Sequence, residues 1–180
     1  MVAVQGRSDR STTLVMDGRT ALLLVDFLCR HWLLLANASL IVFASLPVLA
    51  PILAALGADH AASFIFQLYS VTCHQMPDRS YFILGHQMAF CERNTAIYGT
   101  MAVGGLAYGW LHRGAIEPLP IRWYLVLILP MALDGMSQLF GFRESTWLLR
   151  GLTGGLFGAA TIWLTFPRLQ ESFDEIYAES

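Results

Sequence analysis

The stretch from Trp32 to Leu56 contains no charged residue. About 20 consecutive apolar residues are enough for an α-helix to cross the hydrocarbon core of a bilayer, and this stretch is longer than that. In lipid the backbone polar groups of a single segment have to be satisfied within it, and an α-helix does so. The sequence therefore predicts a membrane-spanning helix, kinked near Pro47 and Pro51, because each proline removes a backbone donor.

The composition of the whole chain agrees with a membrane protein. Of its 180 residues, 56% are hydrophobic and 13% are charged, whereas about 25% of the residues of a soluble domain are charged. The formal net charge is −2 and no basic stripe is present, which argues against a nucleic-acid surface. We expect one multi-pass domain whose main partner is the lipid bilayer.

Three later apolar stretches also have the length of spanning helices: residues 94–111, 123–140 and 146–166. Two other segments differ from them, because residues 19–30 are amphipathic and residues 61–72 are too short to span. We interpret both as helices that lie in the membrane interface. The predicted fold is all-α, a polytopic membrane protein with four transmembrane helices plus one or two interfacial helices.

These segments divide the chain into a polar N-terminus (1–18), a four-helix transmembrane domain (19–166) that includes a Cys/His loop at about 57–93, and an acidic tail (167–180). Four spans place both termini on the same side of the membrane. Seven arginines would lie on that side: Arg7, Arg10, Arg19, Arg30, Arg113, Arg122 and Arg168. Four lie elsewhere: Arg79, Arg93, Arg143 and Arg150. Positive loops favour the cytoplasm, so both termini and the acidic tail are predicted to be cytoplasmic and the Cys/His loop extracytoplasmic.

Glycines recur at helical spacing in two of the predicted spans. Gly105 and Gly109 form one G-x-x-x-G pattern, and residues 151–158 contain two overlapping patterns. Such faces let helices approach closely in lipid. They predict close packing inside the bundle, and the same glycine-rich faces are candidates for contacts with other membrane protein subunits.

Charged residues inside the later spans need partners, because an ionised side chain in lipid costs at least about 2.5–3.5 kcal/mol. Asp134 and Arg150 lie at comparable depths on either side of the turn between the last two spans. We predict that Asp134 pairs with Arg150 or Arg93. Gln138 and Arg143 would complete a structural intramembrane polar cluster, and a proton or ligand site is the alternative interpretation.

The Cys/His loop allows three interpretations. Cys73, His86 and Cys91, with His74 or a carboxylate as a fourth ligand, would offer zinc or another transition metal the thiolate and imidazole ligands it prefers. A disulfide between Cys73 and Cys91 is the second, and an extracytoplasmic position would permit it. Free thiols and histidines in ordinary polar contacts are the third.

Arginines near this surface could also form an anion pocket. The residues concerned are Arg79, Arg93, Arg143 and Arg150. Four acidic residues nearby would neutralise them one for one: Asp78, Glu92, Asp134 and Glu144. We favour this neutral arrangement over an anion pocket.

Several motifs resemble one known family. The first block reads Cys73-His74-Gln75-x-Pro77-x-Arg79-Ser80, Gly85-His86-Gln87 and Cys91-x-Arg93-x-Thr95-x-x-Tyr98. The second reads Pro130-x-x-x-Asp134-Gly135-x-x-Gln138, Arg143-x-Ser145-Thr146 and Arg150-x-x-Thr153-Gly154. Together they are similar to the predicted prokaryotic integral membrane proteins called domain of unknown function 2085 (DUF2085), over about residues 60–160. The resemblance implies a small multi-pass protein of a bacterial or archaeal plasma (inner) membrane and no established activity.

This chain departs from the family pattern at one position. The pattern has a second cysteine three residues after the cysteine at position 91, and this chain has Asn94 there. A four-ligand site built on that pair would lose one thiolate.

The sequence is compatible with three functions. The first is metal binding through Cys73, His74, His86 and Cys91. The second is a non-catalytic accessory or assembly subunit of a larger membrane complex. The third is a membrane thiol–disulfide oxidoreductase, although the chain lacks the C-x-x-C motif that would favour one. The sequence does not choose between an enzyme and a non-catalytic protein.

Overall fold

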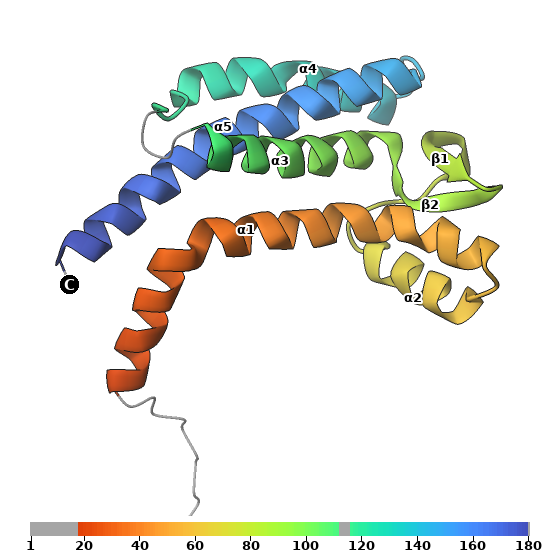
Figure 1. The fold of residues 1–180 in the computed structure, drawn as a ribbon. Coiled ribbons are helices and arrows are strands. Elements are labelled where there is room, and N and C mark those ends of the chain that lie inside the picture. Colours follow the sequence, from red (N-terminus) through yellow and green to blue (C-terminus); the bar gives the residue numbers. More distant parts are fainter. Residues whose placement is uncertain (1–17, 112–115, 180) are drawn as a thin grey trace, which may run out of the picture.

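The computed structural model describes residues 18–111 and 116–179. These residues form five α-helices: α1 (Gly18–Ala55), α2 (Asp59–Tyr69), α3 (Glu92–Trp110), α4 (Ile121–Leu139) and α5 (Trp147–Glu179). A short turn, η1 (Pro77–Arg79), precedes a two-stranded sheet of β1 (Ser80–Ile83) and β2 (His86–Cys91). Figure 1 shows α3 packed between α1 and α5, and α4 covering α5. The chain is mostly helical, as predicted, but the sheet was not foreseen.

Four of the helices coincide with the four predicted spans. By length and composition, one segment in the described part of the chain, Leu23–Ala55, is long and apolar enough to cross a membrane. The helices α3 and α4 have 19 residues each, or about 28 Å at 1.5 Å per residue, close to the roughly 30 Å of a bilayer core. The apolar criterion is met by α1 alone among the described helices, so the four-span topology stays a prediction.

The amphipathic segment 19–30 is not a separate interfacial helix. The helix α1 runs without interruption from Gly18 to Ala55, and Figure 1 shows that it bends within its red, N-terminal portion. No proline or glycine interrupts the chain between Gly18 and Pro47, and an ion pair of 2.8 Å between Arg30 and Asp26 supports the helix there. The second predicted interfacial helix is present as α2.

The last helix continues beyond the predicted end of its span. The predicted tail is helical up to Glu179, because α5 remains regular through Pro167. The predicted polar N-terminus lies outside the described residues except for Gly18. Arg7, Arg10 and Arg113, on which the orientation partly depends, lie outside them as well.

Two prolines create hydrogen-bond acceptors that hold other elements in place. Pro47 cannot donate to the carbonyl of Phe43, and that carbonyl accepts a 2.8 Å hydrogen bond from the hydroxyl of Tyr69 in α2. In α5, the carbonyl four residues before Pro167 accepts the backbone N–H of Leu119 at 3.3 Å. The prolines thus dock α2 and the segment before α4, and both helices continue past them.

The glycine faces are occupied by helices of the same chain. A Cβ at Gly154 would lie 2.8 Å from the carbonyl oxygen of Arg93, and one at Gly158 would collide with the carbonyl one turn further along α3. Gly105 of α3 faces α1, where Asn37 donates to its carbonyl at 3.0 Å. Close packing of α3 against α5 and α1 therefore accounts for these glycines without another subunit.

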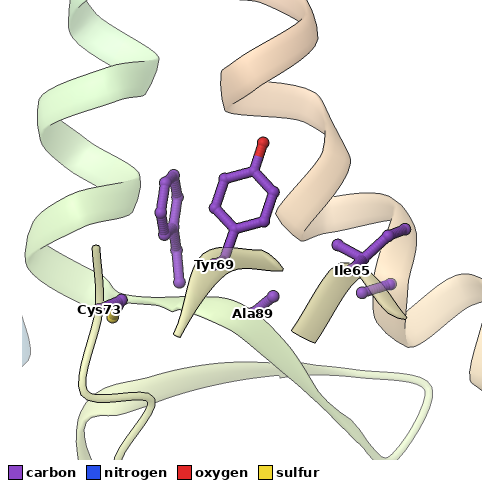
Figure 2. Close-up of a cluster of buried hydrophobic side chains, with 6 residues drawn as sticks. Ile65, Tyr69, Cys73 and Ala89 are labelled. Carbon is purple, nitrogen blue, oxygen red and sulfur yellow. The ribbon is translucent and has the colours of Figure 1, made fainter. Parts of the chain in front are cut away.

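The end of the molecule that carries the hairpin has its own hydrophobic core, shown in Figure 2. Tyr69 and Phe90 are almost fully buried and pack edge to face, with ring centroids 4.8 Å apart. The other buried members are Ala50, Ile65, Cys73 and Ala89. Since these residues come from α1, α2, the following loop and β2, the core fixes the hairpin and Cys73 against the helices.

Candidate functional site

The polar segment that was predicted as a loop folds into a β-hairpin. The strands β1 and β2 pair antiparallel, with Phe82 opposite Gln87. Leu84 and Gly85 form the turn with positive φ angles of 53° and 81°, as in the two-residue turns whose twist matches a hairpin. The sequence contained this signal, a glycine at the second turn position between two short runs of strand-forming residues.

The hairpin brings the two ends of the Cys/His loop together. Cys91 ends β2 and its backbone N–H donates to Sγ of Cys73 at 3.1 Å. Cys73 is 5% exposed and Cys91 is half-buried. Both are free thiols. The predicted pair is therefore adjacent in space although 17 residues separate its members.

Two glutamine side chains fix the loop that carries Cys73. Gln75 has a positive φ of 50°, and its Nε2 donates to the carbonyls of Phe66 (2.8 Å) and Ala89 (3.1 Å). Gln87 in turn donates to the carbonyl of Gln75 at 2.7 Å. These bonds over-determine an uncommon backbone conformation, and such positions concentrate at functional sites.

The two thiols have opposite pKa shifts because one donates to the other. The hydrogen bond from the Cys91 thiol is the largest influence that lowers the pKa of Cys73, from 9.0 to about 6. Burial opposes this shift, while backbone donors of Gln75 and Cys91 and the nearby His74 add to it. The pKa of Cys91 is raised, because its proton is held by Cys73 and the group is buried. The donated hydrogen bond therefore favours the thiolate form of Cys73, while Cys91 keeps its proton.

A buried carboxylate lies at the same end of the bundle. Asp134 is the one buried residue within α4, all of which the structure describes, and it is 2% exposed. It forms ion pairs with Arg93 of α3 and with Arg143 of the α4–α5 loop, the latter at 2.8 Å. Ser145 and Gln138 donate to the same carboxylate at 3.0 and 3.1 Å. The predicted pairing with Arg93 is thus present.

Arg150, the alternative partner predicted for Asp134, pairs with Glu92 instead. Its Nη1 lies 2.9 Å from Oε2 of Glu92, and both side chains are about nine-tenths buried. Glu92 is the first residue of α3, where a carboxylate is favoured by the helix dipole. The sequence predicted similar depths in the membrane for Asp134 and Arg150. The side chain of Arg150 points toward α3, however, and therefore reaches Glu92.

The cysteine pair and three of the arginines share an open cavity of about 520 Å³. The charged, imidazole and thiol side chains that line it are Cys73, His74, Arg79, Cys91, Arg93 and Arg150. Gln138 also lines it, whereas Asp134 and Arg143 do not. Among the described residues of the cavity wall there is no Asp or Glu.

His86 lies elsewhere. It begins β2 beside the hairpin turn and lines a different cavity, with Asp59 and Ala62 of α2. Within residues 18–111 and 116–179, no group of three or more His, Cys, Asp or Glu side chains is arranged to hold a metal ion. The predicted four-ligand set is not assembled, because the hairpin returns Cys91 to Cys73 while it carries His86 to the turn.

Asn94 occupies the position where the family resemblance implies a cysteine. Its side chain lines the same cavity and donates from Nδ2 to the carbonyl of Thr72 at 3.0 Å. A side chain at this position therefore reaches the segment that carries Cys73.

A helical bundle with one long apolar helix and many exposed apolar side chains has features that are common in membrane proteins. The family model described as "Predicted membrane protein (DUF2085)" matches residues 73–164, and the chain belongs to this family. The match includes every predicted site residue from Cys73 to Arg150, so the resemblance expected from the motifs is confirmed.

Two archaeal relatives carry no functional description. A protein of Methanocaldococcus jannaschii, named as uncharacterized, is 38% identical over 144 residues, which are 77% of this chain and 92% of the relative. An uncharacterized protein of Methanothermobacter thermautotrophicus is 35% identical over 82 residues, 46% of this chain and 73% of that protein. No solved structure matches.

Proposed function

We propose that this protein is a membrane thiol–disulfide oxidoreductase in which Cys73 is the attacking thiolate and Cys91 the resolving thiol. The observation that carries the proposal is the 3.1 Å contact between the Cys91 N–H and the Cys73 sulfur, on the wall of an open cavity. Substrate can therefore reach a pair of thiols that are already neighbours. The absence of a C-x-x-C motif from the sequence does not argue against this function, because the β-hairpin brings Cys73 and Cys91 together in space.

The exchange conserves atoms and electrons. The Cys73 thiolate attacks one sulfur of a substrate disulfide, R–S–S–R, forms a bond to it and expels the other sulfur as R–S⁻. This product takes the proton of the Cys91 thiol. The Cys91 sulfur then attacks Cys73, forms the intramolecular disulfide and releases the second R–S⁻. The substrate gains the two electrons that the cysteine pair loses, and the reverse sequence oxidises a substrate dithiol.

The surroundings of Cys73 favour its thiolate form. Cys91 is the N-cap of α3, so the sulfur of Cys73 accepts a hydrogen bond at the positive end of a helix dipole. Arg93 follows within the first turn and lines the same cavity. Helix N-termini and neighbouring cations are the settings in which reactive cysteines have low pKa values.

The proposal includes a four-span topology with the site on the extracytoplasmic side. Large apolar side chains of α4, such as Leu129 and Leu133, are at least half exposed, and contact with lipid would cover them. Thiol exchange is also suited to an oxidising compartment. With Cys29 replaced by Ser, a membrane-impermeant maleimide should label Cys73 in intact cells. Labelling only after lysis would contradict this orientation.

The function can be tested by trapping the mixed disulfide. We expect Cys91→Ser protein, treated with a small disulfide, to keep one substrate half bound at Cys73, a mass increase that mass spectrometry detects. Wild-type protein should instead lose two mass units by forming the internal disulfide. Cys29→Ser is the matched control and should behave as wild type. Failure of Cys73 to react, or zinc bound at one equivalent by Cys73 and Cys91, would overturn the proposal.

A further inference from the structure

We infer that the cavity beside Cys73 binds anions, and that the substrates of the cysteine pair are therefore disulfides of small acidic thiols. This inference rests on the proposed function and adds to it the chemical class of the substrate. It reverses the expectation from the sequence, in which each arginine near the site was neutralised by its own carboxylate.

The charged side chains of the cavity wall, apart from the Cys73 thiolate, are arginines. Arg79, Arg93 and Arg150 line it together with the imidazole of His74, and the described wall contains no carboxylate. The carboxylates that pair with the two more buried arginines belong to Asp134 and to the first residue of α3, and neither lines the cavity. A ligand in the cavity therefore meets the guanidinium groups and not their counter-ions.

The charges near the cavity are unevenly paired. Asp134 serves both Arg93 and Arg143, so one negative charge faces two positive ones. Arg79 has a weak partner, because the carboxylate of Asp78 lies 3.4 Å from its Nε and is 67% exposed. The predicted fourth acid, Glu144, forms no ion pair within the described residues. The one-for-one neutralisation is thus incomplete, because Arg93 shares its counter-ion with Arg143 and the partner of Arg79 is exposed.

Three arginines that line the cavity have unused hydrogen-bond donors. The Nε–H groups of Arg79, Arg93 and Arg150 are buried and make no hydrogen bond within the part of the chain that the structure describes. A buried donor without a partner costs about 1–3 kcal/mol. An anionic ligand in the cavity would raise the number of acceptors available to these guanidinium groups.

The cavity also has the size and position that a small substrate needs. Its volume of about 520 Å³ falls within the range of roughly 300–1,000 Å³ typical of small-molecule sites. The amide side chains of Asn94 and Gln138 line it beside the apolar Met76 and Leu139. Since Cys73 forms part of the same wall, an acid held by the arginines would present its disulfide bond to the sulfur.

The experiment compares three disulfides of similar length in Cys91→Ser protein: 3,3′-dithiodipropionate (two negative charges), bis(2-hydroxyethyl) disulfide (neutral) and cystamine (two positive charges). The rate of mixed-disulfide formation at Cys73 is measured by mass spectrometry at pH 7. Each rate is divided by the rate of the same disulfide with free 2-mercaptoethanol. This division removes the intrinsic reactivity of the probe.

We expect the normalised rate of the anionic disulfide to exceed that of the neutral one about tenfold, since a cleft of one charge sign raises local concentrations by 10-fold or more. Arg79→Gln should reduce this preference at least threefold. It leaves both buried ion pairs intact, because Arg79 contacts only the exposed Asp78. Arg122→Gln, at an exposed position at the start of α4, is the matched control and should leave the preference unchanged.

The two proposals fail in different ways. If Cys73 reacts with none of the three disulfides, the proposed function is wrong. If it reacts with all three at equal normalised rates, the function stands and the anionic substrate class is wrong. The preference should persist in phosphatidylcholine nanodiscs with or without phosphatidylglycerol. A preference that phosphatidylglycerol abolishes would assign the cavity to a lipid headgroup and would overturn the substrate assignment.

Discussion

Replacing Asp134 by Asn removes the negative charge of the most buried carboxylate among the described residues. The amide has nearly the same size as the carboxylate, so no cavity is created. Arg93 and Arg143 both lose their counter-ion, while Ser145 and Gln138 can still donate to the remaining carbonyl oxygen. The substitution therefore isolates the charge from the packing.

The expected loss of stability follows from the exposure of the partners. Removing one member of a buried ion pair costs about 3–5 kcal/mol, and this applies to Arg93, whose side chain is 23% exposed beside a carboxylate that is 2% exposed. Arg143 is 51% exposed and adds at most about 1 kcal/mol. Because Arg93 is not fully buried, we expect a total at the lower end of this range, about 3 kcal/mol, or a fall of about 6–12 °C in Tm for a chain of this length.

The assay is thermal unfolding in detergent, followed by the fraction of protein that stays monodisperse after heating. Asp174→Asn is the control, since this exposed carboxylate accepts one side-chain hydrogen bond from Gln170. Adding Arg143→Gln to Asp134→Asn should restore part of the loss, because it removes one of two unpaired charges. If the Tm of Asp134→Asn lies within 2 °C of the control, the ion pairs do not stabilise the bundle.

Three further outcomes are expected. The alkylation rate of Cys73 by iodoacetamide, measured by peptide mass spectrometry, should rise with pH around a midpoint near 6 instead of 9.0. Cys91→Ala should move this midpoint upward, because it removes the hydrogen bond that lowers the pKa of Cys73. An unchanged midpoint would contradict this cause. Tyr69→Phe should lower the unfolding free energy by about 1 kcal/mol, since its hydroxyl bonds a carbonyl of α1, and a Tm equal to wild type would show that this bond is dispensable. Gly158→Leu should abolish the monodisperse peak in size-exclusion chromatography, because the new side chain would collide with α3. Gly151→Ala should leave the peak intact, because a Cβ at this position meets nothing within 4 Å. A stable Gly158→Leu protein would refute the packing of α5 against α3.

Hydropathy was sufficient to locate the helices but not to describe the site. The apolar runs correspond to α1, α3, α4 and α5 because burial in lipid or protein requires the same backbone hydrogen bonding along each run. The hairpin was missed first because its strands are short, with four and six residues. In addition, three consecutive residues of β2, 88–90, are buried, so this strand lacks the alternation that identifies a half-exposed strand. Without the hairpin, His86 was placed beside the cysteines.

The predicted depth of a side chain in the membrane was not sufficient to identify its ion-pair partner. The rise of 1.5 Å per residue gives the depth of a side chain along its helix, and on this measure Arg150 suited Asp134 as well as Arg93 did. The direction in which a side chain points depends on the rotation of its helix about its own axis. In α5, the glycine face that turns toward α3 carries Arg150 to Glu92, so only the packed helices decide between the partners.

The start of α3 explains why two distant motif blocks belong to one site. Three consecutive residues at this point each contact a different part of the chain. The N-cap residue Cys91 contacts the loop of Cys73, Glu92 pairs with α5, and Arg93 pairs with α4. Cys91 makes its contact through its backbone N–H, whereas the side chains of Glu92 and Arg93 point about 100° apart around the helix and so reach two different helices. The family match over residues 73–164 contains all of these contacts and leaves out α1 and α2. The cysteine pair and the ionic contacts of the bundle are therefore parts of a single structural unit, and a change at Cys91 acts next to the helix turn that holds α4 and α5.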